Sequence, residues 1–192
     1  MDTSPPKPMR ADAIKNRAKI LEAARIELEL HGTDCSLDNI AKRAGVGPGT
    51  LYRHFPTRED LLGELLPSWV ADVQSDADAT SGERWEDVLD WLVRLADHAL
   101  TYRGLAGTMA ATESDETSPL RSAHAAVLLA NSQVFDRARR ARVVSAAIDT
   151  GEISRLVTGV AMIAEQADLS PAQLRSMLAI ILNGLTQEFP HH

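Results

Sequence analysis

The polar side chains most suited to chemistry gather in one short stretch, residues 48–54, which reads PGTLYRH. Four of its side chains offer hydrogen-bond donors, and one glycine lets the backbone approach a surface closely; these residues are Thr50, Tyr52, Arg53, His54 and Gly49. Donors of this kind suit the phosphate oxygens and the base edges of duplex DNA. The sequence shows no nucleophile motif, no glycine-rich phosphate loop and no metal-ligand spacing, so it does not read as an enzyme.

The surrounding sequence predicts two short helices joined by a tight turn. Ser36 is a good N-cap for the first helix, and Gly45 ends it where a left-handed backbone is needed. Pro48 opens the second helix, where its missing N–H does no harm. Apolar residues at helical spacing would join the two helices; they are Leu37, Ile40, Ala41, Ala44, Leu51 and Phe55.

Cap, turn and packing residues together indicate a helix-turn-helix, whose second helix enters the major groove of DNA. The face of that helix left exposed is Pro48, Gly49, Thr50, Tyr52, Arg53 and His54. The alternative is a surface helix that is merely polar.

The stretch LDNIAKRAGVGPGTLYRHFPTREDLL resembles the DNA-binding head of the TetR family of bacterial repressors. The preceding IKNRAKILEAARIELELHG looks like the first helix of that family and ends at Gly32. The resemblance covers roughly residues 12–66 and implies an all-α homodimer with a divergent ligand-binding domain. It also implies DNA contacts from Ser36, Pro48, Gly49, Thr50, Tyr52, His54 and Arg58. Position 58 is more often Lys in the family, and Arg keeps the charge but changes the geometry of a phosphate contact.

The net charge of −7 is unevenly distributed. Residues 1–66 carry ten Lys or Arg and ten Asp or Glu, whereas the remainder carries ten basic and seventeen acidic residues. Contact with phosphates needs a local positive face rather than a positive protein. Residues 7–25 are locally basic and include Lys15, which we assign as a further DNA contact. The alternative for each such lysine is a solvated helix face.

The N-terminal residues 1–11 are expected to form a flexible, extended arm, because they are rich in proline and polar residues. Such an arm can place an arginine in a narrow minor groove. Arg10, or otherwise Lys7, is the candidate for that contact. The alternative is a tail that touches nothing.

The chain is expected to divide into the arm, a helix-turn-helix domain over 12–56, a connecting helix over 57–80, and a helical ligand-binding and dimerisation domain over 81–192. Pro67 should kink or break the connecting helix after Leu66. A polar loop at 74–82 and an acidic loop at 111–118 are predicted, with Ser81 capping the fifth helix. Further helices are expected over 104–112, 118–132, 134–149 and 153–166, with a last helix beginning at Ser170 and Pro171. The fold is therefore predicted to be all-α, with about nine or ten helices.

The last two helices carry apolar stripes at spacings of three and four. Paired about a two-fold axis they would form a four-helix homodimer interface, which also suits a symmetric operator. The alternative is that both stripes pack into the internal core.

A regulatory domain needs a largely apolar cavity with a few polar groups. The candidate lining residues are Trp85, Trp91, Tyr102, Met109, Phe135 and Met162, each of which otherwise belongs to the core. His98 and His124 are candidate donors. No metal and no cofactor are implied.

Cys35 is the one cysteine, which suits a reducing cytoplasm. A thiol near a helix N-terminus can have a depressed pKa and react with oxidants, and the alternative is a small buried filler. The sequence shows no signal peptide and no stretch of 18 apolar residues, so we expect a cytoplasmic protein without a membrane span.

The sequence thus predicts a transcriptional regulator that binds a double-stranded DNA operator and is released by a small-molecule effector. Two alternatives remain open. The first is a DNA-binding regulator under redox or protein control, without an effector. The second is an enzyme or an interaction module.

Overall fold

The computed structural model describes residues 8–186, and in that range the chain forms nine α-helices, one short 3-10 helix and no strand. The predicted all-α fold of about nine or ten helices is confirmed. The head contains α1 (Pro8–His31), η1 (Gly32–Asp34), α2 (Leu37–Ala44) and α3 (Pro48–His54). The rest contains α4 (Arg58–Ala79), α5 (Trp85–Ala99), α6 (Leu105–Thr112), α7 (Arg121–Arg140), α8 (Thr150–Gln166) and α9 (Pro171–Thr186). Within residues 8–186, no helix is long and apolar enough to span a lipid bilayer.

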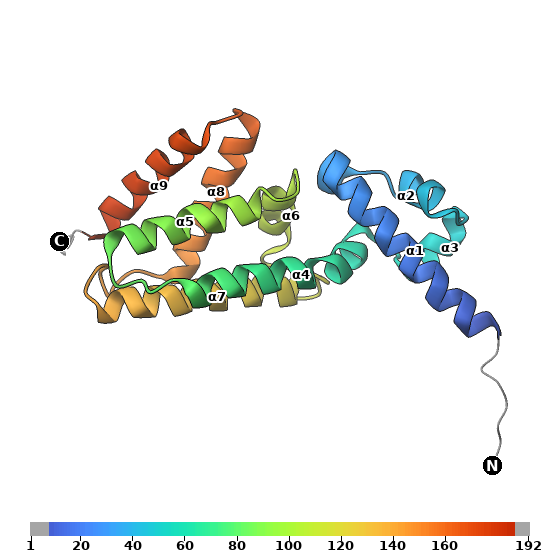
Figure 1. Ribbon diagram of the computed structural model, residues 1–192, viewed down its shortest axis with the longest axis horizontal. Helices are drawn as coiled ribbons and strands as arrows, with labels where there is room; N and C mark the ends of the chain where they lie inside the picture. Colours follow the sequence, from blue (N-terminus) through green and yellow to red (C-terminus); the bar gives the residue numbers. More distant parts are fainter. Residues whose placement is uncertain (1–7, 187–192) are drawn as a thin grey trace, which may run out of the picture.

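The two lobes of the molecule are joined by α4, which runs from the head into the larger helical domain (Figure 1). The head core is closed by Leu51 and Phe55, which are almost fully buried. Gly45 has a φ of +67° and ends α2, and the N–H of Val46 donates to the carbonyl of Ala41 to close the turn. The local signals of glycine and proline therefore produced the turn that the sequence predicts.

Helix α1 begins at Pro8, so residues 8–11 are helical, whereas the sequence suggested an extended arm over 1–11. Proline at the first position of a helix is favourable, because its fixed φ suits the helix and its missing N–H would have had no partner there. Lys7 lies outside the described residues, and so does the side chain of Arg10.

Helix α4 continues through Pro67 to Ala79, so the chain does not break after Leu66, and the loop predicted at 74–82 begins only at residue 80. Pro67 is exposed, whereas Val73 and Ala77 further along the helix are buried. Packing of that buried stripe against α7 outweighs the absence of one backbone hydrogen bond at the proline.

The start of α5 also differs from the prediction. Ser81 does not cap this helix, because its hydroxyl donates to the Asp87 carboxylate at 2.6 Å and the N-cap residue is Arg84. The backbone N–H of Arg84 donates to the same carboxylate, at 3.2 Å. The carboxylate of Asp87, in the first turn of α5, thus accepts from the two residues that precede the helix.

A single helix, α7, replaces the two helices expected over 118–132 and 134–149, and residues 141–149 form a loop. The buried Asn131 lies in the middle of α7 and donates to the carbonyl of Thr150 (3.0 Å) and to the hydroxyl of Ser154 (2.8 Å). The side-chain amide of Asn131 thus has hydrogen-bond partners on α8, and the residue does not interrupt its own helix.

The last helix begins where its capping residues predict, whereas α8 begins at Thr150, three residues before the predicted start. Asp149 caps α8 by accepting from the N–H of Glu152 at 2.9 Å. Ser170 and Gln173 form the expected reciprocal cap before α9, with the N–H of Ser170 donating to the Gln173 side chain at 2.9 Å. In Figure 1, α9 lies on the side of the larger domain away from the head, and α8 crosses the middle of that domain.

Candidate functional site

The outer face of α3 presents the polar residues that the sequence singles out. Its side chains range from exposed to half-buried, and the structure places Pro48, Gly49, Thr50, Tyr52, Arg53 and His54 on this one short helix. Tyr52 is 45% exposed, which is unusual for a large aromatic side chain. Arg53 donates to the Thr50 hydroxyl at 3.3 Å, so these two side chains lie on the same face. The buried Leu51 fixes the opposite face to the core, which leaves the polar face free for a partner.

Ser36 and Arg58, the other two residues that the family resemblance assigns to DNA contacts, have different surroundings. Ser36 is the N-cap residue of α2, but its exposed side chain makes no capping hydrogen bond. Its hydroxyl is not used inside the helix and is available to a phosphate. Arg58 donates to the carbonyl of Thr33 at 2.7 Å and lies 3.3 Å from a carboxylate oxygen of Asp34. A phosphate contact from Arg58 would have to compete with these bonds.

The basic residues of α1 are divided between solvent and structure. Lys15 is exposed. Arg17 pairs with Glu64 of α4 at 2.7 Å, and its guanidinium lies 5.3 Å from the centre of the Phe55 ring. Arg17 therefore helps to fix α1 against α4, and Lys15 is the freer of the two for DNA.

A second connection between head and larger domain, besides α4, lies at η1. The N–H of Thr33 donates to the carbonyl of Arg103 at 2.7 Å, and the hydroxyl of Thr108 in α6 donates to that of Thr33 at 3.1 Å. Gly32 has a φ of +72°, and a Cβ there would lie 2.3 Å from the Arg103 carbonyl oxygen. Only glycine allows the two backbones to approach this closely.

Cys35 does not have the depressed pKa that redox sensing would need. It is buried, and burial raises the pKa of its thiol above the ordinary 9.0, with Arg58 opposing this and Glu27 adding to it. The loss of solvent thus outweighs the nearby positive charge of Arg58, and Cys35 is a small core residue.

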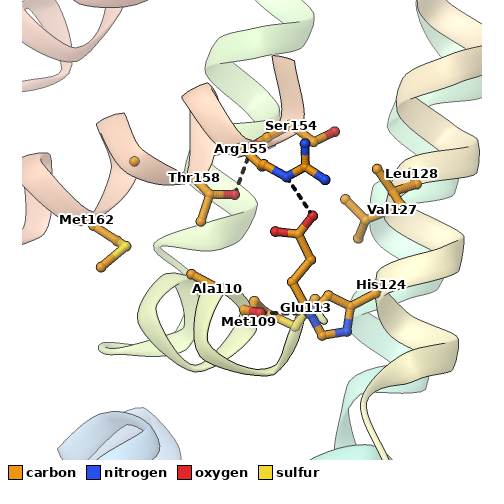
Figure 2. Close-up of a pocket in the computed structure, with 11 residues that line it drawn as sticks. Met109, Ala110, Glu113, His124, Val127, Leu128, Ser154, Arg155, Thr158 and Met162 are labelled. Atoms are coloured by element: carbon orange, nitrogen blue, oxygen red, sulfur yellow. Dashed lines mark hydrogen bonds and ion pairs between the residues drawn. The ribbon is translucent and has the colours of Figure 1, made fainter. Parts of the chain in front are cut away.

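A pocket of about 170 Å³ opens between α6, α7 and α8 in the larger domain. Its wall is mostly apolar, and the few polar side chains in it come from α7, α8 and the end of α6 (Figure 2). The lining residues are Met109, Ala110, Glu113, His124, Val127, Leu128, Ser154, Arg155, Thr158, Gly159 and Met162. A smaller cavity shares Met109, Val127, Ser154 and Thr158 with it and extends to Trp69 of α4.

Most of the polar groups in this pocket are already bonded. His124 has one ring nitrogen 2.9 Å from the Leu120 carbonyl and the other 2.8 Å from the Met109 carbonyl, so it joins α7 to α6. Glu113 and Arg155 meet across the pocket, with Nε of the arginine donating to a carboxylate oxygen at 2.9 Å (Figure 2).

The structure brings together two of the six aromatic and methionine residues proposed as ligand contacts. Met109 and Met162 line the pocket. Trp91 and Phe135 are fully buried, and the indole N–H of Trp91 donates to Asn131 at 2.9 Å. Trp85 and Tyr102 are partly buried and pack on the core. None of these four lines the pocket.

The charged pair of the pocket was missed by the sequence analysis. Glu113 belongs to an acidic stretch that predicts a solvated loop. Arg155 lies between the apolar residues of its helix and reads as an ordinary solvent-exposed charge. The two residues are 42 apart in the chain, so their pairing depends on the packing of α6 against α8. His98, the other histidine considered, bonds to Asp76 at 2.8 Å, away from this pocket.

An apolar surface remains uncovered on the last two helices. Leu156 and Ile163 lie two turns apart on α8 and are 47% and 51% exposed, and Ile180 on α9 is 70% exposed. Gly159 lies between the first two, and a Cβ added there would meet nothing within 4 Å. Within residues 8–186, no group of three or more His, Cys, Asp or Glu side chains is placed to hold a metal ion.

Comparison with known proteins covers both lobes. A model of the TetR family of bacterial regulatory proteins matches residues 20–65, and one described as the C-terminal domain of SbtR-like transcriptional regulators matches residues 86–187. The HTH-type transcriptional regulator SAB2452 from Staphylococcus aureus is 48% identical over 54 residues. That alignment spans 28% of this chain and only 29% of the curated relative.

Solved structures extend the similarity over most of the chain. The TetR transcriptional regulator SCO0520 from Streptomyces coelicolor is 29% identical, with a TM-score of 0.57, over 88% of this chain and 97% of that one. A TetR-family regulator from Rhodococcus has the same fold, with a TM-score of 0.60 over 90% of this chain and 99% of that one, at 21% identity. Since the C-terminal model alone matches more than half of the 192 residues, the chain belongs to the TetR family of transcriptional regulators.

Proposed function

We propose that this chain binds a specific DNA operator as a homodimer and is released from it by a small-molecule effector. The observation that carries the proposal is the outer face of α3, where Thr50, Tyr52 and Arg53 lie together above a buried anchor. In a helix-turn-helix the second helix enters the major groove, and a two-fold dimer places its two heads about one turn of DNA apart.

The dimer would form through α8 and α9. Leu156, Ile163 and Ile180 expose apolar area that water disfavours, and a second copy would cover it. Other residues of these two helices are buried inside the same chain, namely Val157, Leu178 and Leu182. The apolar residues of α8 and α9 would therefore serve both the internal core and the dimer interface.

The effector would occupy the pocket between α6, α7 and α8. It can act on the head because α6 carries Met109 in the pocket and Thr108 against Thr33 of the head. The neighbouring cavity reaches Trp69 on α4, which provides a second route. A ligand that binds one arrangement of these helices more tightly would change the spacing of the heads. Control by oxidation of Cys35 is not favoured, because burial raises its pKa.

The first experiment measures binding of the full-length protein to DNA from upstream of its own gene and to a random duplex of equal length. The titrations are repeated at several salt concentrations. A preference for the upstream DNA supports an operator. A steep salt dependence with no preference between the duplexes contradicts sequence-specific binding there.

A further inference from the structure

We propose that the pocket between α6, α7 and α8 takes a small carboxylate with an apolar body of about one ring, bound through Arg155. The inference rests on the proposed function only in naming this ligand as the effector. It begins with the size of the pocket, because a cavity of roughly 150 Å³ is enough to hold benzene. The pocket measures about 170 Å³ and its wall is lined by Met109, Val127, Leu128 and Met162.

The charge of the ligand follows from the donors that the pocket has left. Both ring nitrogens of His124 lie within hydrogen-bond distance of backbone carbonyls, so neither nitrogen is open to a ligand. The hydroxyls of Ser154 and Thr158 donate to carbonyls one turn back in their own helix, at 3.0 and 2.9 Å. Arg155 differs, because only its Nε is bonded, to Glu113. Its guanidinium has five N–H donors, so the terminal amino groups remain for a ligand.

The protein already shows that a carboxylate fits at this point. Glu113 reaches into the pocket from the end of α6 and presents its carboxylate to Arg155 (Figure 2). Arginine stays charged and binds carboxylates in a bidentate manner, so a ligand carboxylate can bind beside Glu113 or replace it. A cationic ligand would instead have to bind beside the permanent positive charge of Arg155.

Replacement of Glu113 by the ligand carboxylate at Arg155 would also release a contact between two helices. The Glu113–Arg155 pair joins α6 to α8, and Glu113 is the C-cap residue of α6. A ligand that displaces Glu113 frees the end of α6, and the beginning of the same helix contacts the head through Thr108 and Thr33. Binding at the mouth of the pocket is thereby connected to the head.

The test uses three probes with the same ring and different charges: phenylacetate, phenylacetamide and phenethylamine. Calorimetric titration of the full-length protein without DNA should show binding of phenylacetate and at least tenfold weaker binding of the amide and the amine. Arg155→Gln should weaken phenylacetate binding about tenfold or more, and Arg155→Lys should weaken it less. Arg121→Gln, an equal change of charge at an exposed site outside the pocket, should have no effect.

Glu113→Gln gives the sharpest contrast. It removes the competing carboxylate, so phenylacetate should bind several-fold more tightly, whereas a cation site would lose affinity. Equal binding of amide and carboxylate, tighter binding of the amine, or binding of none of the three at millimolar concentration would overturn the proposal. Thermal unfolding of each variant separates loss of the site from loss of the fold.

A separate titration with operator DNA keeps the two proposals apart. If phenylacetate binds through Arg155 and operator affinity does not change, the carboxylate site stands and effector-controlled release fails. If release follows an uncharged or cationic probe, effector control stands and the carboxylate site fails.

Discussion

Thr33 of the head donates its backbone N–H to the carbonyl of Arg103 in the larger domain, at 2.7 Å, between residues 70 apart in the sequence. Gly32 makes this approach possible, since its φ is +72° and a Cβ would lie 2.3 Å from the Arg103 oxygen. The head is therefore held at two points, by α4 and by this contact, and α6 touches the second of them through the Thr108–Thr33 hydrogen bond.

The first prediction concerns Gly32→Ala. Both the left-handed backbone and the contact with Arg103 oppose a Cβ, so we expect a loss of unfolding free energy of about 3 kcal/mol or more. Gly45→Ala is the matched control, because Gly45 has a φ of +67° and open space around it. That variant should lose only the backbone cost of about 1–2 kcal/mol. Equal losses in denaturant titrations would show that the contact at Arg103 is unimportant.

A second prediction concerns Arg53 on the outer face of α3. If Arg53 binds a phosphate, Arg53→Gln should reduce the slope of log affinity against log salt by about 0.9, the value for one neutralised phosphate. If the side chain instead reads a base, the variant should lose preference between upstream and random DNA. Arg140→Gln changes the charge equally on α7 and should alter neither quantity. An Arg53 variant that behaves like this control would place Arg53 outside the interface.

The third prediction concerns Glu27, which is 3% exposed and pairs with Arg43 at 2.6 Å. Its other carboxylate oxygen is buried without a hydrogen-bond partner. Arg43→Gln would leave this carboxylate with only the exposed His31, whose Nε2 lies 3.7 Å away, and should cost about 1–3 kcal/mol, the lower end being favoured because the Arg43 side chain is 40% exposed. Adding Glu27→Gln should recover part of the loss in a double-mutant cycle. A purely additive cycle would contradict the coupling.

Features set by neighbouring residues could be predicted from the sequence, whereas contacts between residues distant in the chain could not. The helix-turn-helix was predictable because Gly45 and Pro48 act locally, through a left-handed turn and a preset φ. The predicted boundary after Ser132 was wrong because the neighbouring Asn131 is satisfied by α8, which is distant in sequence. Glu113 and Arg155 were missed for the same reason: each reads as a solvated charge until α6 and α8 pack together. The DNA contacts assigned from the sequence remain predictions.

The fourth prediction concerns pH and Cys35. Burial raises the pKa of this thiol, so the folded state holds the proton more tightly than the unfolded chain does. The resulting stabilisation is fully present below pH 9.0, the ordinary value, and is lost as the pH rises through the folded pKa. Unfolding free energy should therefore fall more steeply above pH 9.0 in the native protein than in Cys35→Ala. Parallel pH profiles for the two proteins would contradict this assignment.

A fifth prediction concerns the dimer. Ile163→Asp places a charge in the middle of the proposed interface and should give a monomer in light scattering after size-exclusion chromatography. Leu30→Asp is a suitable control, since Leu30 is similarly exposed, at 61% against 51%, but lies on α1 in the head. If both variants remain dimers, the dimer interface does not include this part of α8.

If the pocket takes a carboxylate as proposed, the Glu113–Arg155 pair would also set the ligand concentration to which the protein responds. A carboxylate attached to the same chain competes at an effective concentration in the millimolar range, whatever is present in solution. A free acid that has to displace it must therefore be abundant or gain additional affinity from its apolar body. Trace amounts of simple acids would then leave the protein unchanged, and Glu113 would act as a threshold that separates an accumulating metabolite from background.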